Sequence, residues 1–162
     1  MHLSLSTPRL TINPISINDY AFIQSLLNTP GWIQFIGDRK IHSEEAAKNY
    51  LQKILDNPNV HYWIVRLKDG GVPIGIVTFM IRNYLEDYDF GFAFLPEYGK
   101  QGFAFEAASE VLKELKKNPE YKQILAITLP ENISSINLLE RLGFMYDKNI
   151  LIDNEELKLF IK

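Results

Sequence analysis

The chain has 162 residues, which is enough for one domain with a substantial core and too few for two of ordinary size, so we expect a single domain over residues 1–162. Hydrophobic residues make up 46% of the chain and charged residues 23%, a composition typical of a soluble folded protein. The net charge of −3 argues against nucleic-acid binding, and the absence of cysteine excludes disulfides, thiolate nucleophiles and cysteine-ligated zinc.

The first 60 residues predict one strand followed by two helices. The start, Met1 to Leu5, lacks the charged and apolar regions of a targeting leader, and no segment reaches the ~20 apolar residues that span a bilayer, so we expect a cytoplasmic protein without membrane contact. Residues 7–12 alternate as a strand does, whereas 17–27 and 44–57 have apolar residues at helical spacing. The segment 29–38 between these helices is predicted to be a loop that buries large apolar side chains.

The rest of the chain predicts hairpins that flank a strand-helix-strand unit. Such an order gives an α/β (α+β) fold with a mixed sheet and helices on both faces. The expected strands are 60–67, 72–81, 87–95, 121–129, 144–152 and 155–161, and the expected helices are 105–115 and 133–142.

The segment from Leu95 to Ala107 joins a predicted strand to a predicted helix. Gly99, Gly102 and Ala104 remove bulky side chains where successive backbone N–H groups could approach an anion, and the helix start adds the positive end of its dipole. The segment lacks the Gly-Lys-Ser/Thr ending of a Walker loop and the G-x-G-x-x-G dinucleotide fingerprint. It predicts a pyrophosphate site, and a tight turn before a helix is the alternative.

Asn132 and Ser135 stand at the start of the predicted helix 133–142. Their ordinary role is to accept hydrogen bonds from the first backbone amides of the helix. A side chain at this end of a helix can also contact a ligand, so the two roles are compatible.

Together, these two segments resemble the cofactor-binding half of the GNAT superfamily, in which a Gln/Arg-x-x-Gly-x-Gly/Ala loop holds the pyrophosphate of coenzyme A. Gly99 occupies the position of the first Gln/Arg. The residues that match the family's helix motif are Asn132, Ser135, Gly143 and Phe144. Thr7-Pro8-Arg9-Leu10 and the passage 96–107 are similar to the RimJ/RimL-type branch, which acetylates N-terminal amines of ribosomal proteins.

The resemblance implies the GNAT fold, with a mixed, mostly antiparallel central sheet, and acetyl-CoA as the acyl donor. It implies direct attack on the thioester by a primary amine, either a protein N-terminus or a small molecule, in a ternary complex. A monomer and a homodimer both fit this pattern. The residues expected to bind the cofactor are Phe94, Leu95, Lys100, Gln101, Gly102, Phe103, Ala104 and Asn132.

Alignment with the family's strand motif places Asp89 where an acidic residue could take the proton of the amine, directly or through a water. Asp87 and Glu86 are nearby substitutes, and strand alternation would put Asp87 on the same face as Asp89. The tyrosine that many relatives use as the acid is replaced by Leu139, which leaves the Ser135 hydroxyl to hydrogen-bond the departing thiolate.

The resemblance also places an acceptor pocket between the first two helices and the later strands, with Trp32, Phe35, Tyr84 and Tyr88 available to line it. Core packing is the alternative role of each of these aromatic residues. The three histidines have no metal-ligand spacing, so no metal site is predicted. A GNAT-fold module that binds acyl-CoA without turnover is the alternative function, whereas a generic phosphate-binding domain would leave the second motif unexplained.

Overall fold

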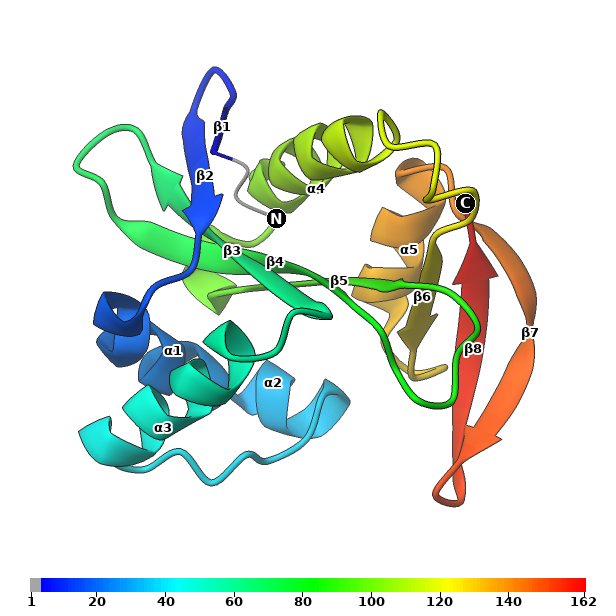
Figure 1. Ribbon diagram of the computed structural model, residues 1–162, viewed down its shortest axis with the longest axis horizontal. Coiled ribbons are helices and arrows are strands. Elements are labelled where there is room, and N and C mark those ends of the chain that lie inside the picture. Colours follow the sequence, from blue (N-terminus) through cyan, green and yellow to red (C-terminus); the bar gives the residue numbers. More distant parts are fainter. Residues whose placement is uncertain (1–3) are drawn as a thin grey trace.

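The computed structural model describes residues 4–162, so the predicted absence of a leader at Met1 to Leu5 lies largely outside the described residues. One sheet of eight strands runs through the molecule, with helices on both of its faces (Figure 1). The strands are β1 Leu5–Ser6, β2 Leu10–Pro14, β3 Val60–Leu67, β4 Pro73–Met80, β5 Asp89–Phe94, β6 Leu125–Thr128, β7 Met145–Ile152 and β8 Glu155–Ile161. The helices are η1 Ile17–Asp19, α1 Tyr20–Leu27, α2 Pro30–Phe35, α3 Glu44–Leu55, η2 Pro96–Tyr98, α4 Phe103–Leu115 and α5 Ile133–Arg141.

The strand order is β1-β2-β3-β4-β5-β6-β8-β7, and every neighbouring pair is antiparallel except β5 and β6. This confirms the predicted mixed, mostly antiparallel sheet. The parallel pair is joined at a single register position, Asp89 opposite Leu125. Beyond this point the two strands separate, and the sheet is divided into two wings (Figure 1).

Each face of the sheet is covered by its own apolar core. One core packs α1, α2 and α3 against β3 and β4 through residues such as Ile23, Leu51 and Ile76. The other packs α4 and α5 against the opposite face, with Phe79, Phe90 and Ala107 among its buried members. The sheet separates the two cores. The gap between β5 and β6 is therefore a place where a ligand could reach both faces of the sheet.

Several predicted boundaries were wrong. Residues 30–35, predicted to be loop, form the short helix α2, since Pro30 at its first turn and the Thr29 hydroxyl, which accepts from the Trp32 N–H, satisfy the helix start. The predicted strand 87–95 begins only at Asp89, and the predicted strand 121–129 only at Leu125. In both cases the residues before the strand lie in the loops that lead to the single β5–β6 contact.

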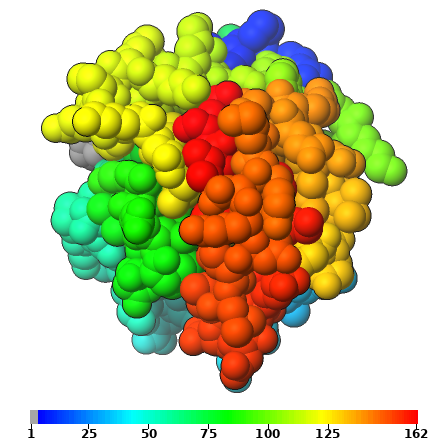
Figure 2. Space-filling view, turned by 90° about the vertical axis from the view of Figure 1, so that its right-hand side faces the viewer, coloured from blue at the N-terminus to red at the C-terminus, as the bar shows by residue number. Residues whose placement is uncertain are grey.

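The β7–β8 hairpin forms the outer surface at one end of the sheet (Figure 2). In the same view, the segment near residue 86 lies beside the segment near residue 120, and these segments border a hollow formed by Ile81, Glu86, Asp87, Tyr88, Glu120, Tyr121 and Gln123. Within residues 4–162, none of the helices combines the length and the apolar character needed to cross a bilayer.

Candidate active site

The gap between β5 and β6 exposes main-chain groups of β5. The N–H of Leu95 donates to the carbonyl oxygen of Ile74 at 2.9 Å, and the carbonyl oxygen of Tyr88 accepts from Leu125 N–H at 2.9 Å. Main-chain groups point alternately to the two sides of a strand, so those of Phe92 and Phe94 are directed into the gap. The predicted cofactor residue Phe94 therefore presents its backbone to the gap, whereas the Leu95 amide is already paired within the sheet.

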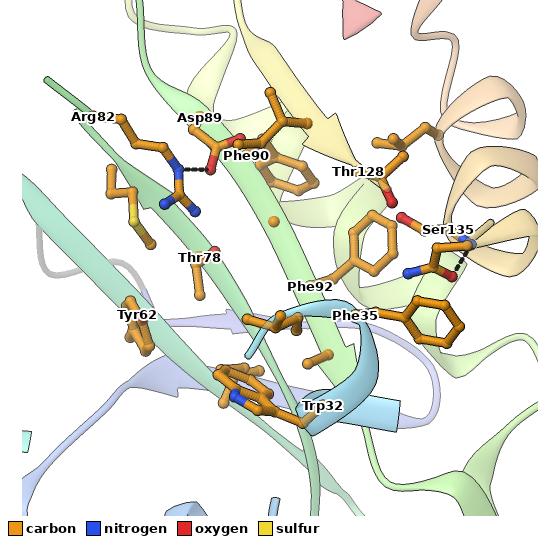
Figure 3. A pocket seen from close by; sticks show the side chains of 18 of the residues that line it. Trp32, Phe35, Tyr62, Thr78, Arg82, Asp89, Phe90, Phe92, Thr128 and Ser135 are labelled. Atoms are coloured by element: carbon orange, nitrogen blue, oxygen red, sulfur yellow. Dashed lines mark hydrogen bonds and ion pairs between the residues drawn. The ribbon is translucent and has the colours of Figure 1, made fainter. Parts of the chain in front are cut away.

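A cavity of about 150 Å³ lies at this gap and extends to both faces of the sheet (Figure 3). It receives side chains from α2, α3, β3, β4, β5, β6 and α5. Its lining residues are Trp32, Phe35, Ile36, Arg39, Tyr50, Tyr62, Ile76, Thr78, Met80, Arg82, Asp89, Phe90, Gly91, Phe92, Ala93, Ile127, Thr128, Asn132, Ser135 and Leu139.

Strand register places one row of the lining across three strands. Tyr62 lies opposite Thr78, and Thr78 lies opposite Gly91. A Cβ atom on Gly91 would stand 2.6 Å from the Thr78 hydroxyl oxygen, so the absence of a side chain at Gly91 keeps the row open beside Thr78. This row forms the floor of the cavity on the face covered by α1, α2 and α3.

Asp89 is the acidic group of this cavity. Its side chain is 4% exposed, and its Oδ2 accepts from the Nε of Arg82 at 2.6 Å. Its Oδ1 makes no hydrogen bond of normal geometry, although the backbone of Ile127 is close enough to influence it. Burial raises the pKa of Asp89 above its usual range, and the charge and hydrogen bond of Arg82 oppose this rise.

Two tyrosines approach each other near this pair. The hydroxyl oxygens of Tyr50, from α3, and Tyr62, from β3, are 3.4 Å apart. Burial raises the pKa of Tyr62 well above its usual value, whereas the charges of Arg82 and Arg39 act to lower it. Tyr62 is consequently a protonated hydroxyl at neutral pH, suited to donating a hydrogen bond.

The α5 side of the cavity contains the predicted residues Asn132 and Ser135. The Asn132 side-chain oxygen accepts from the Ser135 N–H at 3.2 Å, so Asn132 caps α5. Ser135 lines the cavity, as does Leu139, the residue at the position where the family resemblance predicts a tyrosine. One cavity thus contains the candidate base Asp89 and the candidate hydroxyl Ser135 (Figure 3).

The backbone amides of residues 100–105, which we call the amide cradle, lie outside this cavity at the start of α4. Among residues 4–162, none of these six N–H groups has a hydrogen-bond acceptor. Lys100 and Gly102 have left-handed backbone angles, with φ of 59° and 82°. Alternation of such angles directs successive amides to one side, which makes an anion-binding concavity at the positive end of the helix dipole.

The N-terminal segment braces the cradle. Arg9 donates from Nη1 to the carbonyl oxygen of Gln101 at 3.0 Å and from Nε to Glu106 at 2.6 Å, and its guanidinium lies over the Phe103 ring. The Thr7 hydroxyl also donates to Glu106 at 2.5 Å. These contacts involve the Gln101 carbonyl oxygen, the Phe103 ring and the Glu106 carboxylate. They do not involve the backbone N–H groups of the cradle.

The structure separates the remaining predicted residues. Trp32 and Phe35 line the cavity, whereas Tyr84 and Tyr88 do not. Tyr88 stacks on Phe79, with ring centroids 4.3 Å apart, and borders the separate hollow together with Asp87 and Glu86. The expected sharing of a face by Asp87 and Asp89 was wrong, because β5 begins at Asp89 and Asp87 belongs to the preceding bend.

Sequence reasoning missed the arginines and tyrosines of the cavity. Arg39 lies between α2 and α3 and Arg82 between β4 and β5, positions without any periodic signal. Thr78 gave a usable signal, because it is a buried polar residue within an otherwise apolar strand. In the part of the chain that the structure describes, no three His, Asp or Glu residues cluster as metal ligands would.

Comparison with known proteins connects this geometry to a family. Residues 9–145 match the family described as acetyltransferase (GNAT) domain. The chain is 27% identical, over 87% of its length and 82% of the other, to the uncharacterised N-acetyltransferase YnaD of Bacillus subtilis.

Two solved structures share the fold over nearly the whole chain. The ribosomal-protein-S5-alanine acetyltransferase of Vibrio fischeri is 19% identical, with a TM-score of 0.81 over 99% of this chain and 96% of that one. The spermidine N-acetyltransferase of Vibrio cholerae, in complex with CoA and spermine, is 18% identical, with a TM-score of 0.82 over 96% of each chain.

Proposed function

The chain belongs to the GNAT acetyltransferase family, whose acyl donor is acetyl-CoA, and we propose that it transfers the acetyl group to a primary amine by direct attack within the cavity. The observation that carries this proposal is the position of Asp89 and Ser135 in one cavity at the gap between β5 and β6. An amine entering from the α1–α3 face and a thioester entering along the gap would meet there. When bound, acetyl-CoA supplies the acetyl thioester that the amine attacks.

The amide cradle fits the pyrophosphate of coenzyme A. Six amides without an acceptor among the described residues would each gain a partner, and the α4 dipole favours a negative group at this position. Lys100 lies within the cradle and adds a positive side chain. Binding therefore relies on Lys100, Gln101, Gly102, Phe103 and Ala104 mainly through their backbone, as the glycines of the sequence indicate.

The exposed edge of β5 fits the amide-rich arm of the cofactor. Main-chain groups of Phe92 and Phe94 are directed into the gap, where β6 has moved away and provides no partner at this level. An extended chain with amide groups can add to such an edge as another strand would. This arrangement would direct the thioester end of the cofactor toward Asp89 and Ser135.

We propose that Asp89 removes the proton from the attacking amine. Its Oδ1 makes no hydrogen bond of normal geometry, and the raised pKa makes its carboxylate a better proton acceptor than an exposed aspartate. Arg82, bound to Oδ2, holds the carboxylate in position and favours its ionised form. Asp87 and Glu86 border a different hollow, so they are poorer candidates for this role.

We propose that Ser135 stabilises the departing sulfur. Its hydroxyl lines the cavity on the α5 side, opposite the floor that carries Thr78, and its backbone N–H is held by Asn132. A hydrogen bond from this hydroxyl would strengthen as negative charge develops on the sulfur. Trp32 and Phe35 would surround the acceptor and exclude water from the reacting groups.

The test is an acceptor screen with purified protein and acetyl-CoA. Release of free thiol measures turnover, and mass spectrometry of the amine identifies the acetylated product. We expect acetylation within a panel of alkylamines, amino acids, polyamines, aminoglycosides and peptides with free N-termini. If coenzyme A stabilises the protein against heat but no class of amine is acetylated, the chain acts instead as an acyl-CoA-binding module.

A further inference from the structure

The charged groups of the cavity are two arginines and one aspartate. Asp89 is already bound to Arg82, with 2.6 Å between Oδ2 and Nε. Among residues 4–162, no carboxylate lies within salt-bridge distance of Arg39, which also lines the cavity. The lining therefore has a formal charge of +1, and that charge is not neutralised by the protein.

Both arginines lie on the side of the sheet from which the acceptor would enter. Arg39 follows α2, and the charges of Arg39 and Arg82 both act on the buried hydroxyl of Tyr62. The terminal nitrogens of Arg82 point away from its ion pair with Asp89 (Figure 3), and the nearby Tyr84 side chain also acts on this guanidinium. The guanidinium groups thus provide donors at the acceptor end that Asp89 does not use.

We propose that the acceptor amine carries a carboxylate, which Arg39 and the outward donors of Arg82 bind at this end of the cavity. This inference rests on the proposed acetyl transfer and names its substrate class. Guanidinium groups match carboxylates in shape and charge, and Arg39 and Arg82 both line the cavity. A second ammonium, as in a diamine, would find two like charges and no free carboxylate.

Two kinds of acceptor carry both an amine and a carboxylate. One is a free amino acid, and the other is the N-terminal segment of a peptide with an acidic side chain. The small-molecule experiment compares 4-aminobutanoate, pentylamine and 1,4-diaminobutane, which have similar length and differ in the charge of the far end. The peptide experiment compares sequences that begin Ser-Glu, Ser-Gln and Ser-Lys. We expect the highest kcat/KM for the anionic member and the lowest for the cationic member of whichever set is acetylated.

Variants at position 39 test the residue itself. Arg39→Gln should lower kcat/KM for the anionic acceptor by about 10- to 100-fold, mainly through KM, because a charge-assisted hydrogen bond is lost. Its kcat/KM for the neutral acceptor should stay within about threefold, and Arg39→Lys should recover part of the loss. Lys40→Gln removes the same charge from a neighbouring exposed residue and should change neither value.

Two results would overturn the inference. One is an equal effect of Arg39→Gln on the anionic and neutral acceptors, and the other is a wild-type preference for 1,4-diaminobutane or the Ser-Lys peptide. If the wild-type protein acetylates none of these amines, the proposed transfer fails on its own. The carboxylate site is then decided by thermal stabilisation with 4-aminobutanoate in the presence of coenzyme A, which Arg39→Gln should abolish and which pentylamine should not reproduce.

Discussion

The amide cradle and the cavity are built from different parts of the polypeptide. The cradle uses six consecutive backbone amides, whose direction depends on the left-handed angles of Lys100 and Gly102. The cavity uses side chains from seven helices and strands, which meet where β5 and β6 separate after one contact. A site of the first kind depends on local conformation, whereas a site of the second kind depends on the whole fold.

This difference gives each site its own response to mutation. In the cradle, only a change of backbone angle or a new charge next to the amides should matter, because side chains do little of the binding. In the cavity, a single polar side chain should control the chemistry, because each one has a separate partner and position.

The largest effect is expected at Asp89. Asp89→Asn should lower kcat by about 100- to 10,000-fold at neutral pH, the usual contribution of a general base. Asp89 must be ionised to accept a proton, so wild-type kcat/KM for pentylamine should fall as the pH drops through a pKa above the ordinary 3.8. This fall at low pH, the acidic limb of the pH profile, should disappear in Asp89→Asn. In that variant, kcat/KM should only rise with the fraction of neutral amine.

Arg82→Gln is the control for the ion pair. Removing either partner of a buried ion pair leaves an uncompensated charge, so Asp89→Asn and Arg82→Gln should both lower the free energy of unfolding. Because Arg82 is 31% exposed, we expect this loss to be at most ~3 kcal/mol. Only Arg82→Gln should move the acidic limb to higher pH, because the arginine charge lowers the pKa of Asp89. Loss of stability in both variants without any change of the limb would mean that Asp89 has only a structural role.

The next effect concerns the cradle. At a hundredfold excess over its Kd, coenzyme A should stabilise the native protein by about 2.7 kcal/mol, or roughly 5–10 °C in Tm for a chain of this size. Gly102→Asp should abolish this shift, because a carboxylate would stand among the amides at a position whose φ of 82° already disfavours a side chain.

Gly71→Asp is the matched control. Gly71 also has a positive φ, of 66°, and a Cβ there would meet nothing within 4 Å. It lies in the turn between β3 and β4, so the substitution introduces the same charge and a similar backbone strain elsewhere. A full coenzyme A shift in Gly102→Asp, or a lost shift in Gly71→Asp, would contradict the cradle.

A smaller effect is expected at Ser135. Ser135→Ala should lower kcat by about 10- to 100-fold, the size of a lost hydrogen bond to a charged group, with little change in coenzyme A affinity. Its backbone N–H still donates to Asn132, so the helix cap is retained and Tm should change little. A wild-type kcat in this variant would leave the sulfur without a hydroxyl partner from α5.

These two sites also differ in how far the sequence predicts them. The cradle was predicted from Gly99 and Gly102, because its geometry is encoded by neighbouring residues. Helix α4 begins two residues earlier than expected, at Phe103, since Gly102 already supplies the left-handed cap before it. Leu95 was predicted to bind the cofactor, but its amide is not available for this, because it already donates to the carbonyl oxygen of Ile74 in the register of β4 and β5.

In the cavity, the sequence located Asp89, Ser135, Trp32 and Phe35 but not their surroundings. Arg39 and Arg82 come from irregular segments, whose side-chain directions depend on packing and have no period. Tyr84 and Tyr88 were expected to be available to line the acceptor pocket, yet they lie in the loop before β5 and do not line the cavity. A group of side chains that seven helices and strands bring together has no continuous pattern along the chain.

The smallest effect is expected at Arg9, which contacts the cradle and the first turn of α4. Its guanidinium binds the Gln101 carbonyl oxygen and the Glu106 carboxylate. The Arg9 side chain is 47% exposed, and its backbone N–H is not one of the cradle amides. Arg9→Gln should therefore weaken coenzyme A binding only a few-fold and lower stability by at most ~1 kcal/mol, as for other exposed ion pairs.

The pH dependence of stability identifies the partner that Arg9 acts on. Burial alone would raise the pKa of Glu106, but hydrogen bonds from Thr7 and Arg9 lower it below 4.5 overall. A depressed pKa in the folded state stabilises the protein above pH 4.5, and this stabilisation is lost as the pH falls through the folded-state pKa. The difference in Tm between wild type and Arg9→Gln should accordingly be present at pH 7 and shrink on acidification below that pKa. A difference that stays constant with pH would mean that Arg9 acts through its contact with the Phe103 ring and not through Glu106.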